Sequence, residues 1–394
     1  MKKMLGLLLL SLSAVALAAP DTQWLTVDND VLAKIRPKLN KSVQTLYSAQ
    51  GASVVEMSPA EIEQLGAVIH NELHRCGGFI AHDSYEEAQT ALTSQGEMYF
   101  AKQAIFADYT INQAEVVRPI VAQVAETSIR NMIIKLSDFK TRYYKSETGV
   151  QSSEFIRDSW AALSKHRSDV KVELIKHKSW AQPSIVMTIE GSNLSEEIII
   201  LGGHADSIAG MFGGMARAPG ADDNASGIAT ITEVIRVLME NNFKPRRTIQ
   251  FMGYAAEEVG LLGSKDIAAS YKEKSQKVIG VMQLDMTLNK GTADKDIVMM
   301  SDFTNAAQNE FLGKLIDEYV KVSWGYSRCG YGCSDHASWT ANGYPASMPF
   351  ESTMEDINHK IHTPNDTLQN AGGDAKHAAK FAKLATAFVV ELAN

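Results

Sequence analysis

The chain has 394 residues, of which 45% are hydrophobic and 21% charged, and its formal net charge is -8 at pH 7. A chain of this length and composition buries one large core or two modest ones, which excludes disorder on a large scale. The acidic balance, with no cluster of Lys and Arg, argues against nucleic-acid binding because phosphate contacts need a basic face.

The N-terminus has the pattern of an export signal. Lys2 and Lys3 precede an apolar run over 5–17, which is too short to span a bilayer and ends in an A-x-A cleavage pattern. We therefore predict that residues 1–19 are a cleaved signal peptide, that the protein is secreted to the extracellular side, and that it has no membrane contact after cleavage. A retained membrane anchor is the disfavoured alternative, since the apolar run stops at Pro20.

Residues 20–107 differ from the rest of the chain. They contain helical patterns, for example over 59–74, but no acidic or histidine residues at predicted strand ends. From about residue 108 onward, strands and helices alternate. We predict that 20–107 is a propeptide, cleaved on maturation, that assists folding or keeps the remainder, 108–394, inactive. Composition leaves a stable accessory domain open as the alternative.

One motif in this N-terminal stretch is a decoy. His70 and His74 lie at i and i+4 of the predicted helix, as in the zinc motif H-E-x-x-H, but the acidic residue, Glu72, is in the third position instead of the second. It would point away from the histidine face. We interpret the pair as ordinary helix histidines.

Three short apolar runs in the second part of the chain predict strands. They span 198–201, 248–252 and 278–284, and the first is bounded by two glycines, as expected for a strand covered on both faces of a parallel sheet. In α/β sheets, ligands bind at the carboxyl ends of the strands. The acidic and histidine residues that follow these runs are His204, just past the first, Glu257 and Glu258, and Asp285.

A helix is predicted between the first two strands. It begins at Ser226, extends to about Glu240 and has one apolar stripe that would pack on the sheet. Asp222 and Asp223 fall in the loop before its N-terminus, where the helix dipole favours negative charge. Simple capping is the alternative explanation, although one acidic residue would be enough for a cap.

Cys329 and Cys333 enclose the segment Gly330-Tyr331-Gly332, whose glycines would allow so short a loop to close. Because we expect the protein outside the cytoplasm, we predict a disulfide between them; two unpaired buried thiols are the alternative. Three cysteines are too few for a four-cysteine zinc site. Cys76 is left as an odd thiol.

The order of acidic and histidine residues indicates a site for two metal ions. Zinc accepts imidazole nitrogen and carboxylate oxygen, and two ions about 3.5–4 Å apart need one carboxylate to bridge them. Two histidines and three carboxylates, one of them shared, would complete such a pair and leave one carboxylate to act as a base. Spacing alone does not distinguish Asp222 from Asp223, or Glu257 from Glu258.

Asp206 is suited to a supporting role. In extended chain, residues two apart face the same side, so Asp206 can accept the second ring N–H of His204 and fix its tautomer. The alternative is a plain surface carboxylate.

These residues lie in blocks that resemble those of bacterial secreted dizinc leucyl aminopeptidases, members of the zinc-dependent exopeptidase family. The resemblance extends from about residue 110 to the C-terminus and leaves the N-terminal stretch outside. The blocks are GGHADS at 202–207, PGADDNASG at 219–227, AAEEVG at 255–260, QLDM at 283–286, CGYGCSDH at 329–336 and IHT at 361–363.

The resemblance implies a three-layer α/β/α fold with a mostly parallel, mixed central sheet, and a cofactor of two Zn²⁺ per chain. It implies that the protein hydrolyses the N-terminal residue, preferably Leu or another hydrophobic residue, from peptides or proteins. It further implies that a disulfide at Cys329 and Cys333 lies beside the substrate pocket. By motif position, Asp223 would bridge the ions, Glu258 and His362 would complete one site, His204 and Asp285 the other, and Glu257 would be the general base.

By the same similarity, the pocket for the first substrate residue would have an apolar wall. Met354 and Ile357 stand where aromatic residues are common in the family, and Asn224 replaces an acidic residue seen in some relatives. We expect a monomer with no nucleic-acid partner. The predicted wall includes Met286, Met299, Tyr331, Met348, Phe350 and Ile361.

Three other interpretations compete with this one. The least favoured is a purely structural carboxylate cluster, which would leave the ordered placement of these residues at strand ends unexplained. Related dizinc folds act as carboxypeptidases or amidohydrolases, and a panel of free-amine and N-blocked substrates would distinguish these. A receptor-like or binding module with an inactive peptidase fold is the remaining alternative. Such modules usually lose ligands or the base, whereas all five proposed ligands and the base are present here.

Overall fold

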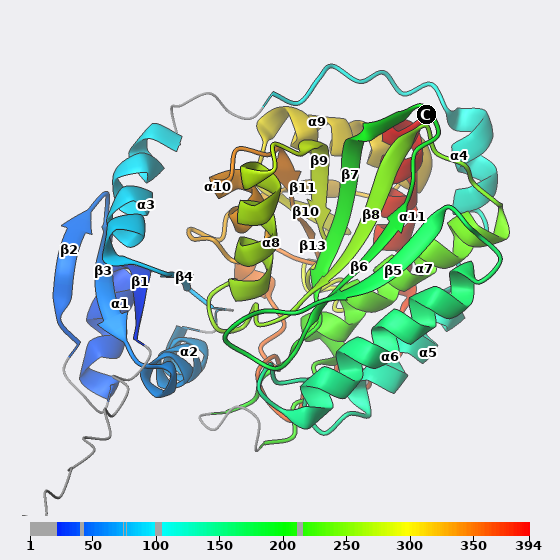
Figure 1. The fold of residues 1–394 in the computed structure, drawn as a ribbon. Helices are drawn as coiled ribbons and strands as arrows, with labels where there is room; N and C mark the ends of the chain where they lie inside the picture. The colour runs from blue at the N-terminus through cyan, green and yellow to red at the C-terminus, as the bar shows by residue number, and fades with distance from the viewer. Residues whose placement is uncertain (1–21, 40–42, 74, 76, 99–104, 211–215) are drawn as a thin grey trace, which may run out of the picture.

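The chain forms two units, a smaller N-terminal unit over 22–98 and a larger unit that begins at residue 105 (Figure 1). The predicted signal peptide, His74 and Cys76 lie outside the described part of the chain. None of the described helices combines the length and the apolarity that crossing a membrane would require. The computed structural model describes residues 22–39, 43–73, 75, 77–98, 105–210 and 216–394.

The N-terminal unit is a four-stranded antiparallel sheet with strand order β2-β3-β1-β4. Alternate residues of its strands face opposite sides, so Val55 packs towards α1 and α2, whereas Val54 packs towards α3. Its elements are β1 (Gln23–Asp28), α1 (Asn29–Ile35), a 3₁₀ turn (Arg36–Lys38), β2 (Thr45–Ala49), β3 (Ala52–Met57), α2 (Pro59–Leu73), β4 (Phe79–His82) and α3 (Tyr85–Met98).

The larger unit is built on a six-stranded sheet with strand order β12-β9-β7-β8-β6-β5. Strands β12, β9, β7 and β8 are parallel, and β6 and β5 extend the sheet in antiparallel pairing. The prediction of a mostly parallel mixed sheet is therefore confirmed. The strands are β5 (Val170–Ile175), β6 (Ser184–Ile189), β7 (Leu194–His204), β8 (Arg247–Tyr254), β9 (Lys277–Gln283) and β12 (Ala346–Ser347).

Helices cover both faces of this sheet, as the apolar run in β7 requires. Ile199 and Leu201 pack against α7, α11 and the helices beside them, while Ile198 and Ile200 pack against α8 and α10 on the opposite face (Figure 1). The result is the three-layer α/β/α arrangement. The helices are α4 (Ala114–Val121), α5 (Glu126–Ser137), α6 (Glu147–Ser164), α7 (Gly227–Glu240), α8 (Leu262–Glu273), α10 (His336–Ala341) and α11 (Lys376–Ala393).

A small three-stranded sheet lies beside the large one and carries part of the apolar pocket described below. Its strand order is β11-β10-β13, with β10 and β11 parallel. Its elements and the remaining short segments are β10 (Ile297–Met300), α9 (Ala306–Leu315), β11 (Trp324–Ser327), β13 (Pro349–Phe350), the kinked loop Ala221–Ser226, the π-helical turn Ile316–Val320, and the 3₁₀ turn Met354–Asp356.

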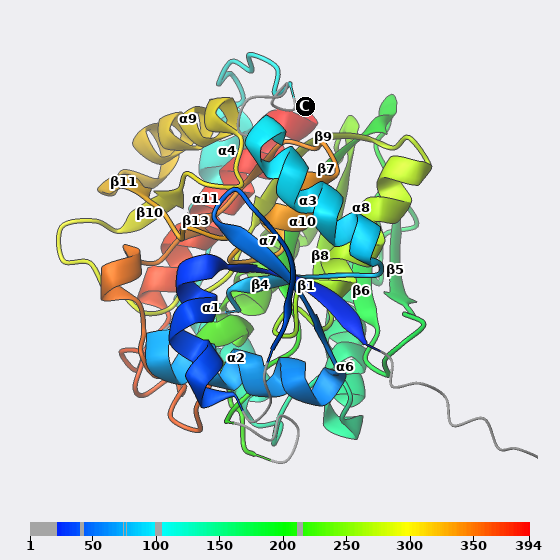
Figure 2. The ribbon, with the colours of Figure 1, turned by 90° about the vertical axis from the view of Figure 1, so that its left-hand side faces the viewer.

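The N-terminal unit packs on the loops that follow β7 and β8, and Figure 2 views the molecule from that side. Leu65 and Ile69 of α2 share an apolar cluster with Ile208 and Val259 of the larger unit. In addition, the backbone N–H of Ala81 donates to the carbonyl of Gly260 at 3.3 Å. Those loops carry Asp206, Glu257 and Glu258 of the sequence motif, so the N-terminal unit lies over them.

Candidate metal centre

The predicted ligands gather at the carboxyl ends of neighbouring parallel strands. His204 is the last residue of β7 instead of the first residue beyond it, and Asp285 lies in the loop after β9. Glu257 and Glu258 lie in the turn that follows β8. Since β7 pairs with both β8 and β9, their ends bring these side chains together.

Two glycines allow the segments to approach closely. A Cβ on Gly203 would lie 2.8 Å from the carbonyl oxygen of Leu284, and a Cβ on Gly227 would lie 2.3 Å from the same oxygen. Both distances are too short for a larger residue without movement of the backbone. The glycine beside His204 therefore allows the end of β9 to lie close to β7. The glycine at the start of α7 allows the same segment to lie close to α7.

Asp223 lies between the two histidines. One of its carboxylate oxygens, Oδ1, is 3.0 Å from Nε2 of His204, and the other, Oδ2, is 3.0 Å from Nε2 of His362. On the first side Asp285 Oδ1 lies 3.4 Å from His204 Nε2, and on the second side Glu258 Oε2 lies 2.7 Å from His362 Nε2. The arrangement is two half-sites that share one carboxylate.

The side chain of Asp222 points elsewhere, which separates the pair that spacing left ambiguous. Its Oδ1 accepts the backbone N–H of Leu288 at 3.0 Å, and its Oδ2 accepts from the amide of Asn358 at 2.8 Å. Donor atoms of His204, Asp223 and Glu258, in contrast, all lie within 4.8 Å of one another.

The donor set fits a cation. The side chains are buried, yet both carboxylate oxygens of Glu258 and Oδ1 of Asp285 form no hydrogen bond within the described part of the chain. Burial by itself lowers the pKa of His204, but the carboxylates of Asp285 and Glu257 outweigh it and raise that pKa well above its usual value. A site that attracts positive charge this strongly, with imidazole and carboxylate donors, suits Zn²⁺.

Asp206 lies close to His204 and also accepts hydrogen bonds from the turn after β8. Its Oδ1 lies 3.3 Å from Nδ1 of His204. Its two oxygens also accept the backbone N–H groups of Glu257 at 3.1 Å and of Glu258 at 3.2 Å. Asp206 therefore positions Glu257 and Glu258 through their backbone, and its distance to His204 is compatible with the predicted role of orienting that ring.

Sequence reasoning missed Asp366 and the role of Asn224. The carboxylate of Asp366 accepts the backbone N–H groups of Asp222 and Asp223, both at 3.0 Å. The Asn224 side chain donates to the carbonyl of Leu284 at 3.0 Å and accepts from Met286 N at 3.2 Å. Asp366 follows His362 by four residues in a turn, but nothing in the local pattern marks it as a partner of a loop so distant in sequence.

Arg142 was also missed. It is fully buried and donates to the carbonyls of Ala205 at 3.0 Å, Pro219 at 2.6 Å and Gly220 at 3.0 Å. Burial lowers the pKa of its guanidinium to about 10, while nearby carboxylates, Asp366 foremost, raise it. Arg142 thus ties the loop after β7 to the loop before α7 and brings positive charge close to the acidic centre.

Glu257 is buried beside the two half-sites. Burial raises the pKa of its carboxyl group well above the usual range, His204 acts in the opposite direction, and the carboxylates of Glu258 and Asp285 raise it again. A carboxylate in such surroundings binds a proton readily.

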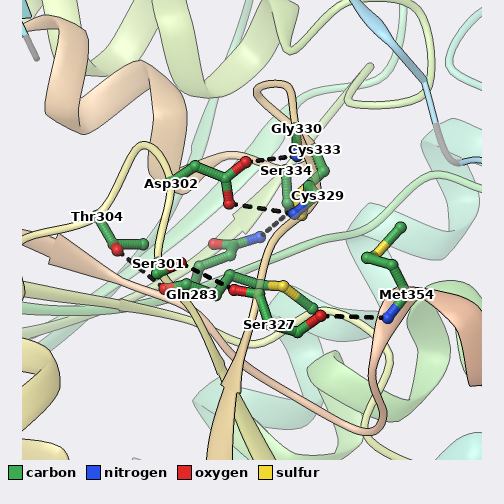
Figure 3. The surroundings of a disulfide bond; sticks show 11 residues. Gln283, Ser301, Asp302, Thr304, Ser327, Cys329, Gly330, Cys333, Ser334 and Met354 are labelled. Atoms are coloured by element: carbon green, nitrogen blue, oxygen red, sulfur yellow. Dashed lines mark hydrogen bonds between the residues drawn. A yellow bond between two sulfur atoms is a disulfide. The ribbon is translucent and has the colours of Figure 1, made fainter.

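An apolar pocket adjoins Asp285, and the disulfide predicted between Cys329 and Cys333 forms part of its wall. Figure 3 shows that Asp302 anchors this loop by accepting the backbone N–H groups of Cys329 and Gly330. The described pocket and the apolar cluster around it contain Met286, Met300, Tyr331, Met348, Phe350, Met354, Ile357 and Ile361.

The prediction for Met299 differs from what the structure shows. Met299 is buried in the main core of the large unit, and its neighbour Met300 joins the cluster around the pocket instead. The reason is the alternation of side chains in β10, which places successive residues on opposite faces. Residue types alone did not fix which methionine faces the pocket.

Comparisons with known proteins agree with this geometry. A family model described as peptidase family M28 matches residues 184–389. The probable leucine aminopeptidase 1 of Trichophyton verrucosum is 36% identical over 374 residues, which cover 89% of this chain and 97% of that protein. Leucine aminopeptidase 1 of Arthroderma otae is 38% identical, with 75% of this chain and 81% of that protein covered.

The structure is also similar to the crystal structure of the LapA aminopeptidase from Legionella pneumophila. The TM-score is 0.82 at 29% sequence identity, and the match covers 95% of this chain and 99% of that one. Coverage this high extends the similarity beyond the part from residue 110 onward and into the N-terminal unit.

The contacts of Asp206 lead to a test. We expect Asp206→Asn to lower Zn²⁺ affinity by about 10- to 100-fold, because the amide no longer fixes the His204 ring as a carboxylate does. Competition titration with a chromophoric chelator would measure this affinity. Asp138→Asn, on a carboxylate at the end of α5 with no contact to the centre, is the matched control. Unchanged affinity in a folded Asp206→Asn variant would contradict the role given to Asp206.

Proposed function

We propose that this chain, which belongs to peptidase family M28, is a metallo-aminopeptidase that removes the N-terminal residue from peptides or proteins. The observation that carries the proposal is the buried pair of half-sites that share Asp223, next to an apolar pocket. The relatives named leucine aminopeptidase support a preference for Leu or another hydrophobic first residue.

The residues at the two half-sites would hold two Zn²⁺ ions. His204 and Asp285 would bind one, Glu258 and His362 the other, and Asp223 both. When bound, the ions would supply Lewis-acid polarisation of the substrate carbonyl and a water molecule of lowered pKa. A substrate whose carbonyl group lay at this centre would have its free α-amine close to the carboxylates of the two half-sites.

Glu257 would be the general base. Its carboxylate would take the proton of the attacking water and then pass that proton to the leaving amine, which is the role for which a buried carboxyl group of raised pKa is suited. The apolar pocket beside Asp285 would hold the side chain of the first residue. Its flexible methionines would accommodate several apolar shapes.

Replacement of the base separates catalysis from metal binding. We expect Glu257→Ala to lower kcat by at least about 100-fold, since general bases contribute on the order of 10²–10⁴, while the protein retains its zinc. Steady-state kinetics and metal analysis of the same preparation would measure both. If a folded variant lost its zinc as well as its activity, Glu257 would be a ligand instead of the base.

The N-terminal unit would keep the enzyme latent, as a propeptide of a zymogen. Gly66, Ala67 and Gly77 of that unit face Glu258 and His362 across a cavity of about 10 Å³. That volume holds about one water molecule, so these residues of the N-terminal unit lie directly against the half-site. Substrate could reach this half-site only after the unit moves or is removed.

Cleavage between the units would therefore activate the enzyme. The described segment 105–113 between them has no regular secondary structure, and Ile105 is 88% exposed. We propose that residues 1–19 act as a signal peptide that directs export of the protein. The exported chain would then be cleaved near residue 107, and the mature enzyme would act on peptide N-termini as a monomer.

Limited proteolysis tests the latency. We expect cleavage between the units, followed by removal of the N-terminal fragment, to raise the specific activity on a leucine anilide at least about tenfold, because access to the centre is restored. Activity before and after cleavage, together with the mass of the fragments, would be measured. Equal activity of intact and cleaved protein would exclude latency.

A further inference from the structure

The loop closed by the disulfide, residues 329–333, contacts two different partners. One side forms the wall of the apolar pocket through Cys329, Tyr331 and Cys333. The other side faces the N-terminal unit across a cavity of about 190 Å³, into which Asp28, at the end of β1, projects with neighbouring residues of that unit. The position of the N-terminal unit is therefore linked to the wall of the substrate pocket.

Charged side chains of both units lie near this cavity and the loop. The guanidinium of Arg75 lies over the ring of Tyr331, 5.4 Å from its centre, and Asp302 holds the loop through the N–H groups of Cys329 and Gly330. Asp28 is half-buried. The charged groups that act on it are Asp30 from α1, Arg75 from the segment after α2, and Asp302 from the segment after β10. Among the described residues that line the cavity, Asp28 and Tyr331 alone are ionisable.

We propose that the N-terminal unit is held over the disulfide loop by a proton-dependent interaction across this cavity, in which a neutral Asp28 favours the covered form and an ionised Asp28, repelled by the charge of Asp302, loosens it. The full chain would be most tightly latent at acidic pH and less so at neutral pH. This inference rests on the latency proposed above.

The sign follows from the pKa of Asp28. Burial raises this pKa from 3.8 to about 6, with Asp30 and Asp302 adding to the rise and Arg75 opposing it. When the unit lifts, the cavity opens, so Asp28 loses the part of its burial that Phe303 and the disulfide loop provide, together with the repulsion from Asp302, and its pKa falls towards its usual value. The covered form therefore binds the proton more tightly. Its extra stability is fully present below the lower pKa and is lost as pH rises through about 6.

The size of the effect has an upper limit. A difference of about two pKa units corresponds to a change of at most about 100-fold in the equilibrium between covered and open forms. The change is smaller to the extent that Asp30, which moves with Asp28, contributes to the shift.

The test compares latency at two pH values. The measured quantity is the activity of the zinc-loaded full chain on a leucine anilide divided by that of the cleaved enzyme at the same pH. A low ratio means a latent chain, and the pH dependence of catalysis cancels. We expect this ratio to rise several-fold between about pH 5 and about pH 8 in the unmodified protein. In Asp28→Asn, which is neutral at both pH values, the ratio should stay low throughout. Glu56→Gln removes an exposed carboxylate of the same unit, bonded to Thr22, and should behave as the unmodified protein.

A second readout does not depend on activity. Hydrogen exchange of the backbone over 255–260, the loop under the N-terminal unit, should be faster at about pH 8 than at about pH 5 after correction for intrinsic rates, and Asp28→Asn should remove the difference. Identical pH dependence in the unmodified protein and in Asp28→Asn would overturn the proton-dependent contact and leave latency intact. A full chain as active as the cleaved enzyme at every pH would overturn latency itself, and this contact with it.

Discussion

The structure depends on one electrostatic constraint, the burial of several carboxyl groups and two histidines at one end of the sheet. Buried carboxylates repel each other and cost free energy unless a cation or hydrogen-bond donors compensate them. Asp206 and Asp366 meet this constraint by accepting backbone N–H groups, and the buried Arg142 adds positive charge. The oxygen atoms of Glu258 and Asp285 that accept no hydrogen bond from any described residue are the part that a metal would satisfy.

Much of the fold and the centre could be predicted from the sequence, because strand ends in a parallel sheet converge. The apolar runs that precede His204 and Asp285 are enough to place both residues at one edge of the sheet. Spacing could not distinguish Asp222 from Asp223, since neighbouring residues in a loop point in directions that long-range contacts set. Asn358 and Leu288 fix the direction of Asp222, and both lie far away in sequence.

The position of the N-terminal unit could not be predicted for a similar reason. Its helical patterns indicated folded structure, but packing between units depends on surface shape, and Ile208 and Val259 meet Leu65 only after both units have formed. The same helix that completes this apolar contact brings Gly66 and Ala67 close to Glu258 and His362. The interface would therefore combine attachment with the obstruction of the centre that we propose, and Asp28 lines a second cavity of this interface together with the disulfide loop.

Two zinc ions at the His204 and His362 half-sites would make this protein an aminopeptidase. The most direct measurement is release of amine from leucine anilide by the cleaved enzyme, before chelation, after chelation and after zinc restoration, with the N-acetylated anilide as control. The account predicts activity on the free amine alone, lost with the chelator and restored at about two zinc ions per chain. Full activity without metal, or equal cleavage of the blocked substrate, would contradict it.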